Sequence, residues 1–284
     1  MAKFVLVTGG NAGIGLALCQ QLIREHGCHV FMGSRDPAKG AAAVASLALP
    51  EEAAARCTVV QLDVCSDESV QAAACTVKAA LGGSPLYAVV NNAGTSTGGG
   101  HGATEEGVID TNFYGPKRVC DAFIPLLDPA VGRIANVGSG AGGGYVNRLG
   151  ETEEARMLMK GDATWDELVE YVKAKMPTIS LDDHGVYPAI YGLSKACLAA
   201  YTQFLAKTHP GILSSCMSPG FIDTAMTKGY GGSKPPEEGT PAIRKCLFDK
   251  LEGNGWYYGS DGMRSPYHFM RNPGMDVYDG VMPF

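Results

Sequence analysis

Phe4-Val-Leu-Val-Thr-Gly-Gly-Asn-Ala-Gly-Ile-Gly15 decides the fold, because it joins an apolar run to a helical pattern through clustered glycines. Residues 4–7 have the composition of a strand buried on both faces, and residues 16–26 have helical periodicity. Glycine there allows a sharp turn, while the helix N-terminus presents free N–H groups to a pyrophosphate. A glycine cluster alone usually marks only a tight turn, but after a first strand it predicts a dinucleotide site. The predicted contacts are Gly9, Asn11, Ala12, Gly13, Ile14 and Gly15.

Strands and helices alternate along most of the chain. Further strands are predicted at 29–32, 57–62, 86–90, 133–137 and 212–217, and further helices at 37–49, 67–81, 105–127, 188–205 and near 241–251. This alternation indicates an α/β protein with a doubly wound parallel sheet, the Rossmann fold. Ligands of such sheets bind at the carboxyl ends of the strands. We predict a single domain over residues 1–284.

Two regions break this rhythm. Between the strand at 133–137 and the helix at 188–205 we predict a helical insertion, at about 145–187, that covers the site. It contains helical patterns at 151–159 and 164–175, the second opened by the capping box Thr164-Trp-Asp-Glu167.

The second region is an irregular C-terminal extension at about 252–284, whose aromatic residues are expected to pack and not to catalyse. Glycine-rich stretches at 97–102 and 140–144 suggest mobile substrate loops.

The segment Tyr191-Gly-Leu-Ser-Lys195 lies in the helix predicted at 188–205. Tyr191 and Lys195 are four residues apart, so their side chains leave the same face of the helix one turn from each other. A nearby ammonium favours the phenolate and lowers the pKa of a tyrosine from about 10, which suits proton transfer near neutral pH. Taken alone, the pair is more simply an exposed Tyr and Lys on an amphipathic helix.

The strand at 29–32 is followed by Gly33-Ser34-Arg35-Asp36, which bears on the choice of cofactor. An acidic residue at this strand tip would bind the adenosine ribose hydroxyls, whereas an arginine pairs with a 2′-phosphate. Arg35, with Ser34 as an additional donor, favours NADP(H), although Asp36 follows directly and Arg35 could be a solvated loop cation.

At this point the chain resembles the classical short-chain dehydrogenase/reductase family over about residues 3–225. The motifs that carry the resemblance are Thr8-Gly-Gly-Asn-Ala-Gly-Ile-Gly15, Leu62-Asp-Val64, Asn91-Asn-Ala-Gly94, Asn112 in Thr-Asn-Phe-Tyr-Gly, Asn136-Val-Gly-Ser139, Tyr191-x-x-Ser-Lys195 and Pro219-Gly-Phe-Ile-Asp-Thr224. The N-terminal half, the insertion and Pro235-Pro-Glu-Glu-Gly-Thr-Pro241 are further similar to the monomeric, NADPH-dependent carbonyl reductase branch.

The resemblance implies how a cofactor would be held. Asp63 and Val64 would lie against the adenine, and Asn91, Ala93 and Gly94 would line the cofactor. The nicotinamide amide and the pyrophosphate would be held by Pro219, Gly220, Phe221 and Thr224.

The resemblance also implies four catalytic roles. Tyr191 would be the general acid, and Lys195 would lower its pKa and bind the nicotinamide ribose. Ser139 would hydrogen-bond the substrate oxygen, and Asn112 would hold a water that links Lys195 to solvent. Two aligned donors, Ser139 and Tyr191, suit the negative charge that develops on a reduced carbonyl oxygen.

Two positions depart from the family pattern. Ala12 replaces a basic residue common in NADP-preferring members, and Gly138 stands where a serine often precedes the catalytic one.

The predicted function is NADPH-dependent reduction of ketones or aldehydes to alcohols. The alternatives are a dehydrogenase specialised for one secondary alcohol, such as a steroid or terpenoid, and a non-catalytic NADP(H)-binding sensor. Because the insertion would cover the surface through which family members associate, we expect a monomer.

Composition excludes several other classes. The formal net charge is -6 and no Lys/Arg block occurs, which argues against nucleic acid and anionic membranes. No apolar run is long enough to span a bilayer, and no signal peptide is recognisable. The nine cysteines are scattered without metal-like spacing, so we expect a metal-free protein in the reducing cytoplasm. From the motifs above, its expected partner is a small carbonyl compound.

Overall fold

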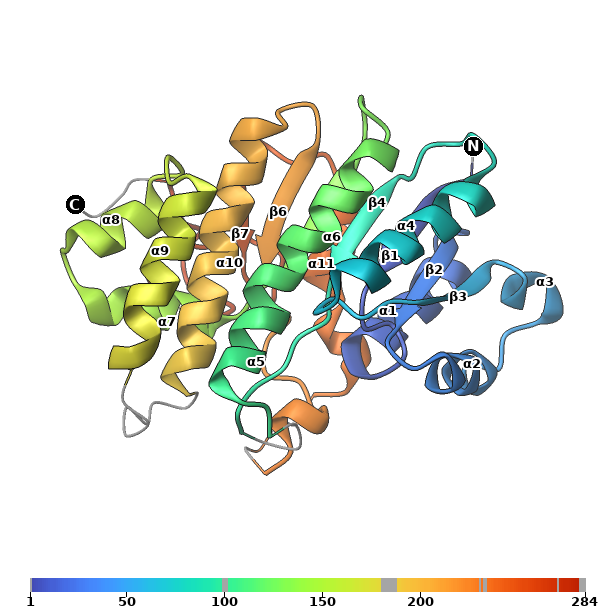
Figure 1. Ribbon diagram of the computed structural model, residues 1–284, viewed down its shortest axis with the longest axis horizontal. Helices are drawn as coiled ribbons and strands as arrows, with labels where there is room; N and C mark the ends of the chain where they lie inside the picture. Colours follow the sequence, from blue (N-terminus) through green and yellow to red (C-terminus); the bar gives the residue numbers. More distant parts are fainter. Residues whose placement is uncertain are drawn as a thin grey trace.

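A seven-stranded parallel sheet forms the centre of the computed structural model, which describes residues 2–98, 102–179, 188–229, 231, 234–269 and 271–280 (Figure 1). The strands are β1 Phe4–Val7, β2 His29–Ser34, β3 Cys57–Gln61, β4 Ala88–Asn91, β5 Arg133–Val137, β6 Leu213–Met217 and β7 Trp256–Tyr258. Their order is β3-β2-β1-β4-β5-β6-β7. The chain therefore builds one half of the sheet outward from β1 and then crosses over to β4, which confirms the predicted doubly wound fold.

Helices cover both faces of the sheet, because successive strand residues point to opposite sides. Leu6 and Phe31 belong to one apolar core, and Val5, Val7 and Met32 belong to the other. The first core is covered by α4 Asp67–Leu81, α6 Gly115–Phe123 and α10 Ala189–Thr208, and the second by α1 Gly13–Arg24, α2 Pro37–Ser46 and α11 Pro241–Phe248. The short helix α3, Glu51–Ala54, was not predicted.

The helix predicted at 105–127 is not regular. It consists of α5 Glu105–Ile109, a π-helical turn Asp110–Tyr114, α6, and a 3₁₀ turn Ile124–Leu126. Pro116 has no N–H, so it cannot donate the α-helical bond to the Asn112 carbonyl four residues earlier. The irregular turn is thus centred on Asn112, and such turns often occur at functional sites.

The insertion is helical, as expected, and forms α7 Gly140–Leu149, α8 Glu153–Met159 and α9 Trp165–Lys175 beside α10 (Figure 1). The Thr164–Glu167 capping box is present, with the Thr164 N–H donating to Glu167 Oε2 at 2.7 Å. Trp165 stacks on Phe113 and meets Tyr201 edge to face, which fixes α9 over α10.

The prediction of a mobile loop at 140–144 was wrong, since these glycines form the first turns of α7. Gly142 allows α7 to pack closely on α10, because a Cβ at this position would lie 2.9 Å from the Ala196 nitrogen. The other glycine-rich stretch, 97–102, lies partly outside the described residues.

The C-terminal extension adds strand β7 to the sheet and then folds back along its outer edge. Tyr258 and Arg264 form an antiparallel bridge, and the Ser265 N–H donates to the Tyr257 carbonyl at 2.8 Å. The extension therefore covers the edge that β7 would otherwise expose.

Two absences concern the described residues. No helix among them is long and apolar enough to cross a membrane. In the same part of the chain, no three His, Cys, Asp or Glu side chains gather where they could hold a metal ion.

Candidate active site

The glycine turn after β1 leads into a helix whose N-terminus has no side-chain cap. Ala12 is the N-cap residue of α1 and supplies no oxygen, and the first turn contains no acidic residue. By contrast, Ser66 caps α4 and Thr164 caps α9. The first N–H groups of α1, those of Gly13, Ile14 and Gly15, are thus available to an anion, as a pyrophosphate-binding turn requires.

The turn is locked to the loop after β4 by residues that the sequence did not single out. Asn92 Nδ2 donates to the carbonyls of Thr8 and Gly9 at 2.9 and 3.2 Å. Thr8 Oγ1 accepts from the N–H groups of Asn92 and Ala93, both at 3.0 Å. A Cβ at Gly9, whose φ is +61°, would lie 3.0 Å from Ala93 Cα. Thr8 and Asn92 therefore fix the position of the glycine turn relative to the loop after β4.

The Asn91 side chain is buried inside the protein. Its Nδ2 donates to Asn136 Oδ1 at 2.8 Å, and Asn136 Nδ2 donates to Thr202 Oγ1 at 2.9 Å. This buried polar chain joins β4, β5 and α10, so the Asn91 side chain has a structural partner at this position.

The tip of β2 presents Arg35 to solvent, while its neighbours are occupied. Ser34 is buried and its hydroxyl donates to the Asp36 carbonyl at 2.7 Å, so that hydrogen is used within the protein. The Asp36 carboxylate caps α2 and accepts from the Ala38 N–H at 2.9 Å. Arg35 is thus the exposed charged group at this tip that is not engaged in capping.

Asp63 and Val64 follow β3, as expected for residues near the adenine. Asp63 Oδ1 accepts from the Cys65 N–H at 3.0 Å. Val64 is buried against the start of α6, where a Cβ at Gly115 would lie 3.0 Å from Val64 Cγ2.

Lys195 is buried near the carboxyl end of β5, with 4% of its surface exposed. Its Nζ donates to the Val137 carbonyl at 2.9 Å, at the carboxyl end of β5, and lies 5.7 Å from the centroid of the Tyr191 ring. Burial lowers the pKa of Lys195 to about 8, and nearby Cys216 acts in the opposite direction. At pH 7 the ammonium is therefore still mostly protonated.

Asn112 is fully buried and its side chain makes three hydrogen bonds. Nδ2 donates to the Thr95 carbonyl and to Ser194 Oγ at 2.9 and 3.1 Å, and Oδ1 accepts from the Thr95 N–H at 2.8 Å. A Cβ at Gly94 would lie 3.3 Å from Asn112 Oδ1 and 3.6 Å from Lys195 Nζ. Asn112, Gly94 and Lys195 therefore meet around one point.

Ser139 lies at the start of α7, which packs against α10. It is the N-cap residue of α7, and its Oγ accepts from the Ala141 N–H at 3.2 Å. A Cβ at Gly192 of α10 would lie 3.2 Å from the Ala141 carbonyl. The start of α7 thus lies against the turn of α10 that carries Tyr191, which is buried at 7% exposure.

The segment after β6 approaches the glycine turn from the opposite side. Gly220 has φ +88°, which allows the chain to turn after Pro219. A Cβ at Gly13 would lie 3.4 Å from Thr224 Cγ2. Gly13 and Thr224 thus flank the uncapped N-terminus of α1, while Phe221 is half-buried in the same segment.

Comparison with known proteins agrees with this arrangement. Residues 3–150 match the sequence profile of the short chain dehydrogenase family. The chain is 32% identical to (+)-neomenthol dehydrogenase of Arabidopsis thaliana, over 88% of this chain and 93% of that protein. It belongs to the short-chain dehydrogenase family.

Two further relatives of this short-chain dehydrogenase are informative. It is 30% identical to carbonyl reductase [NADPH] 3 of Rattus norvegicus, over 87% of this chain and 91% of the relative. The structure of salutaridine reductase from Papaver somniferum superposes with a TM-score of 0.75 at 28% identity, over 90% of this chain and 99% of that one.

One departure of this short-chain dehydrogenase from the family pattern has a structural reason. A Cβ at Gly138 would lie 2.7 Å from Cys216 Sγ and 3.2 Å from Tyr257 Cε2, so a serine does not fit there. Tyr257 comes from β7, which sequence reasoning missed. Its hydroxyl is buried close to the Ser218 side chain.

Proposed function

We propose that this short-chain dehydrogenase reduces a ketone or aldehyde to an alcohol with NADPH, with Tyr191 as general acid. The observation that carries the proposal is the placement of Lys195 on the Val137 carbonyl at the tip of β5, two residues before Ser139 and one helical turn from Tyr191. The N-terminus of α1, free of a side-chain cap, lies at the same edge of the sheet, where ligands of this fold bind.

NADPH, when bound, would supply the hydride. Gly13, Ile14 and Gly15 would hold its pyrophosphate through backbone N–H groups, with Thr224 across the turn. Arg35 would pair with the 2′-phosphate, because Asp36 is already used as the cap of α2. The name of the relative carbonyl reductase [NADPH] 3 supports this preference.

The chain's own residues would manage the proton and the charge. Reduction leaves negative charge on the carbonyl oxygen, and the hydroxyls of Ser139 and Tyr191 would both donate to it. Tyr191 would then transfer its proton to that oxygen and become a phenolate. The Lys195 ammonium would stabilise this phenolate and return a proton to it, and a water on the second lone pair of Asn112 Oδ1 would link Lys195 to solvent.

The mechanism is tested by Tyr191→Phe, which removes one hydroxyl and keeps the ring. We expect NADPH oxidation with aromatic ketones, α-dicarbonyls or quinones to fall at least about a hundredfold. Cofactor affinity, measured by titration calorimetry, should stay within about threefold. Undiminished turnover in the variant would exclude Tyr191 as the acid.

Cofactor preference is tested separately by Arg35→Ser. Loss of the guanidinium should raise the KM for NADPH about tenfold and leave that for NADH unchanged, because only the phosphate contact is removed. Steady-state kinetics with both cofactors measures the ratio. Equal effects on both would mean that Arg35 does not read the 2′-phosphate.

A second candidate is a dehydrogenase specialised for one secondary alcohol. The names of two relatives, (+)-neomenthol dehydrogenase and salutaridine reductase, favour it. A panel of simple carbonyl compounds against cyclic terpenoid and alkaloid ketones separates the candidates: one strongly preferred ketone supports the specialised enzyme, and broad activity supports the general reductase.

We further propose a monomer in the cytoplasm. The insertion helices cover the outer face of α10, and the C-terminal extension covers the edge of β7, so two surfaces suited to self-association are occupied. All nine cysteines are free, which fits a reducing compartment. Light scattering at micromolar concentration tests the first point, and localisation of a tagged chain tests the second.

A further inference from the structure

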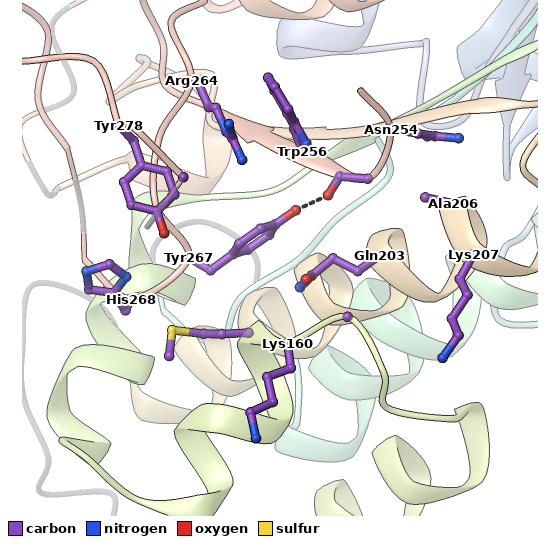
Figure 2. Close-up of a pocket in the computed structure, with 14 residues that line it drawn as sticks. Lys160, Gln203, Ala206, Lys207, Asn254, Trp256, Arg264, Tyr267, His268 and Tyr278 are labelled. Atoms are coloured by element: carbon purple, nitrogen blue, oxygen red, sulfur yellow. Dashed lines mark hydrogen bonds between the residues drawn. The ribbon is translucent and has the colours of Figure 1, made fainter. Parts of the chain in front are cut away.

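A cavity lies where the C-terminal extension crosses the C-terminal half of α10 (Figure 2). We call it the tail pocket; its volume is about 400 Å³, within the range of small-molecule sites. Its walls come from the end of α8, the second half of α10, the start of β7 and the extension. The lining side chains used below are Lys160, Gln203, Lys207, Trp256, Arg264 and Tyr267, with His268 and Tyr278 at one end.

The tail pocket is separate from the candidate active site. Gln203 lies twelve residues beyond Tyr191 on α10, which corresponds to about 18 Å along the helix axis. In addition, Trp256 opens β7, whereas Ser139 and Lys195 lie at the carboxyl ends of the strands. A ligand in the tail pocket would therefore not touch the reacting groups.

The charge of the pocket is opposite to that of the protein. Lys160, Lys207 and Arg264 line it, and no Asp or Glu does so among the described residues, although the whole chain carries -6. Burial lowers the pKa of His268, so the positive charge at pH 7 comes from the other three. Figure 2 shows the side chains of Lys160 and Lys207 extending away from Trp256.

Arg264 is the group in the pocket that most needs a partner. Its guanidinium carbon lies 3.4 Å from the centroid of the Trp256 ring and 5.5 Å from that of Tyr278. It is half-buried, and within the described ranges its guanidinium forms neither a hydrogen bond nor a salt bridge. A guanidinium has five N–H donors in a planar fork that suits a carboxylate or a phosphate.

The aromatic walls are held in place. The Tyr267 hydroxyl donates to the Gly255 carbonyl, and its ring packs against Tyr257 with centroids 5.8 Å apart. His268 meets Tyr278 edge to face at 5.9 Å. A planar ring entering the pocket would thus meet pre-formed aromatic surfaces next to an unpaired guanidinium.

We propose that the tail pocket binds a small planar aromatic carboxylate, whose oxygens pair with Arg264, stacked on Trp256, while its ring packs against Tyr267. Lys160 and Lys207 attract the anion without fixing its orientation. The site is independent of the dinucleotide and of the reaction.

The test uses the full chain with saturating NADP⁺ and two probes of the same shape, 2-naphthoate and 2-naphthamide. The carboxylate should bind at least about tenfold more tightly than the amide in titration calorimetry, because only it can pair with Arg264. The chain has two tryptophans, so the indole N–H resonance of Trp256 should shift on addition of naphthoate while that of Trp165 should not. Trp165→Phe assigns the two signals.

Variants locate the charge. Arg264→Gln should weaken naphthoate about tenfold and leave naphthamide unchanged, and Lys207→Glu should weaken naphthoate about threefold. The matched control is Lys78→Gln, an exposed lysine on α4, which should change neither affinity. If Arg264→Gln does not fold, the Lys207→Glu titration and the Trp256 shift decide. Equal binding of the two probes, an unshifted Trp256, or competition with NADP⁺ would overturn the proposal.

Discussion

Lys195 carries a positive charge that the fold disfavours. Its Nζ donates to the Val137 carbonyl, and in the described part of the chain no carboxylate forms a salt bridge with it. Burial lowers the pKa of the folded protein's Lys195 to about 8, whereas an unfolded lysine keeps a value near 10.5. Between these two pH values the unfolded chain binds the extra proton, so folding stability rises with pH in this window and falls again as pH drops toward 8.

Comparison with Lys195→Met isolates this effect from other titrating groups. As pH rises from 8 to 10, the unfolding free energy of the wild type should increase relative to the variant by up to about 1.4 kcal/mol per pH unit. Below pH 7.5 the difference should be constant. Urea denaturation of both proteins at pH 7, 8.5 and 9.5 measures it, and a difference independent of pH throughout would show that Lys195 is not buried as a cation.

At this scale the sequence predicts the spacing of a motif better than the direction of a side chain. Tyr191 and Lys195 could be placed on one helix face because helical geometry fixes neighbours four residues apart. Asn91 was expected to line the cofactor, yet its side chain faces Asn136, since a short apolar strand does not reveal which residues point up. The role of Asn92 was missed because its partners, Thr8 and Gly9, are distant in the chain.

Among the elements, helix α7 shows why local preference misleads. Five residues of Gly140-Ala-Gly-Gly-Gly144 have low helix propensity on average, so the sequence favours a loop. In the folded protein they are helical, and at Gly142 α10 lies so close that only glycine fits. Conversely, the helix predicted at 105–127 contains a π-helical turn, which Pro116 explains once the register is known.

Two of the glycines of α7, Gly142 and Gly144, differ in the space available to a side chain. Gly142→Ala places a Cβ 2.9 Å from backbone atoms of α10, which should push α7 away, displace Ser139 and lower kcat about tenfold. Stability should fall by about 1–3 kcal/mol. Gly144 has open space, with its nearest neighbour at 4.0 Å, so Gly144→Ala should retain kcat and gain up to about 1 kcal/mol. Reduction kinetics and urea denaturation of both variants provide the measurement.

An equal loss of kcat in the two variants would contradict this explanation, because only Gly142 faces α10.

For the whole molecule, the alternation of strands and helices was enough to predict the sheet, but not its last strand. β7 has only three residues, all aromatic, and is too short to show a strand pattern in the sequence. Its place depends on pairing with β6 and on the extension that returns along it.

Truncation tests what the extension does for the molecule as a whole. A chain ending at Met263 loses Arg264 and Ser265 and should expose the edge of β7, so we expect concentration-dependent association. A chain ending at Gly280 retains both residues and should behave as the full-length protein. Light scattering between about 1 and 100 µM distinguishes them. A truncated chain that stays monomeric would show that this edge needs no cover.

The uncapped N-terminus of α1 links the amount of the protein in a cell to the supply of its cofactor. Helices α2, α4 and α9 are capped by Asp36, Ser66 and Thr164, whereas the first N–H groups of α1 would be satisfied by the phosphates of a bound dinucleotide. A copy that has lost its dinucleotide is the weaker species by mass action, and it is the first to reach chaperones and proteases. Supply of the nucleotide would then govern how much of the enzyme persists, as well as how fast it works.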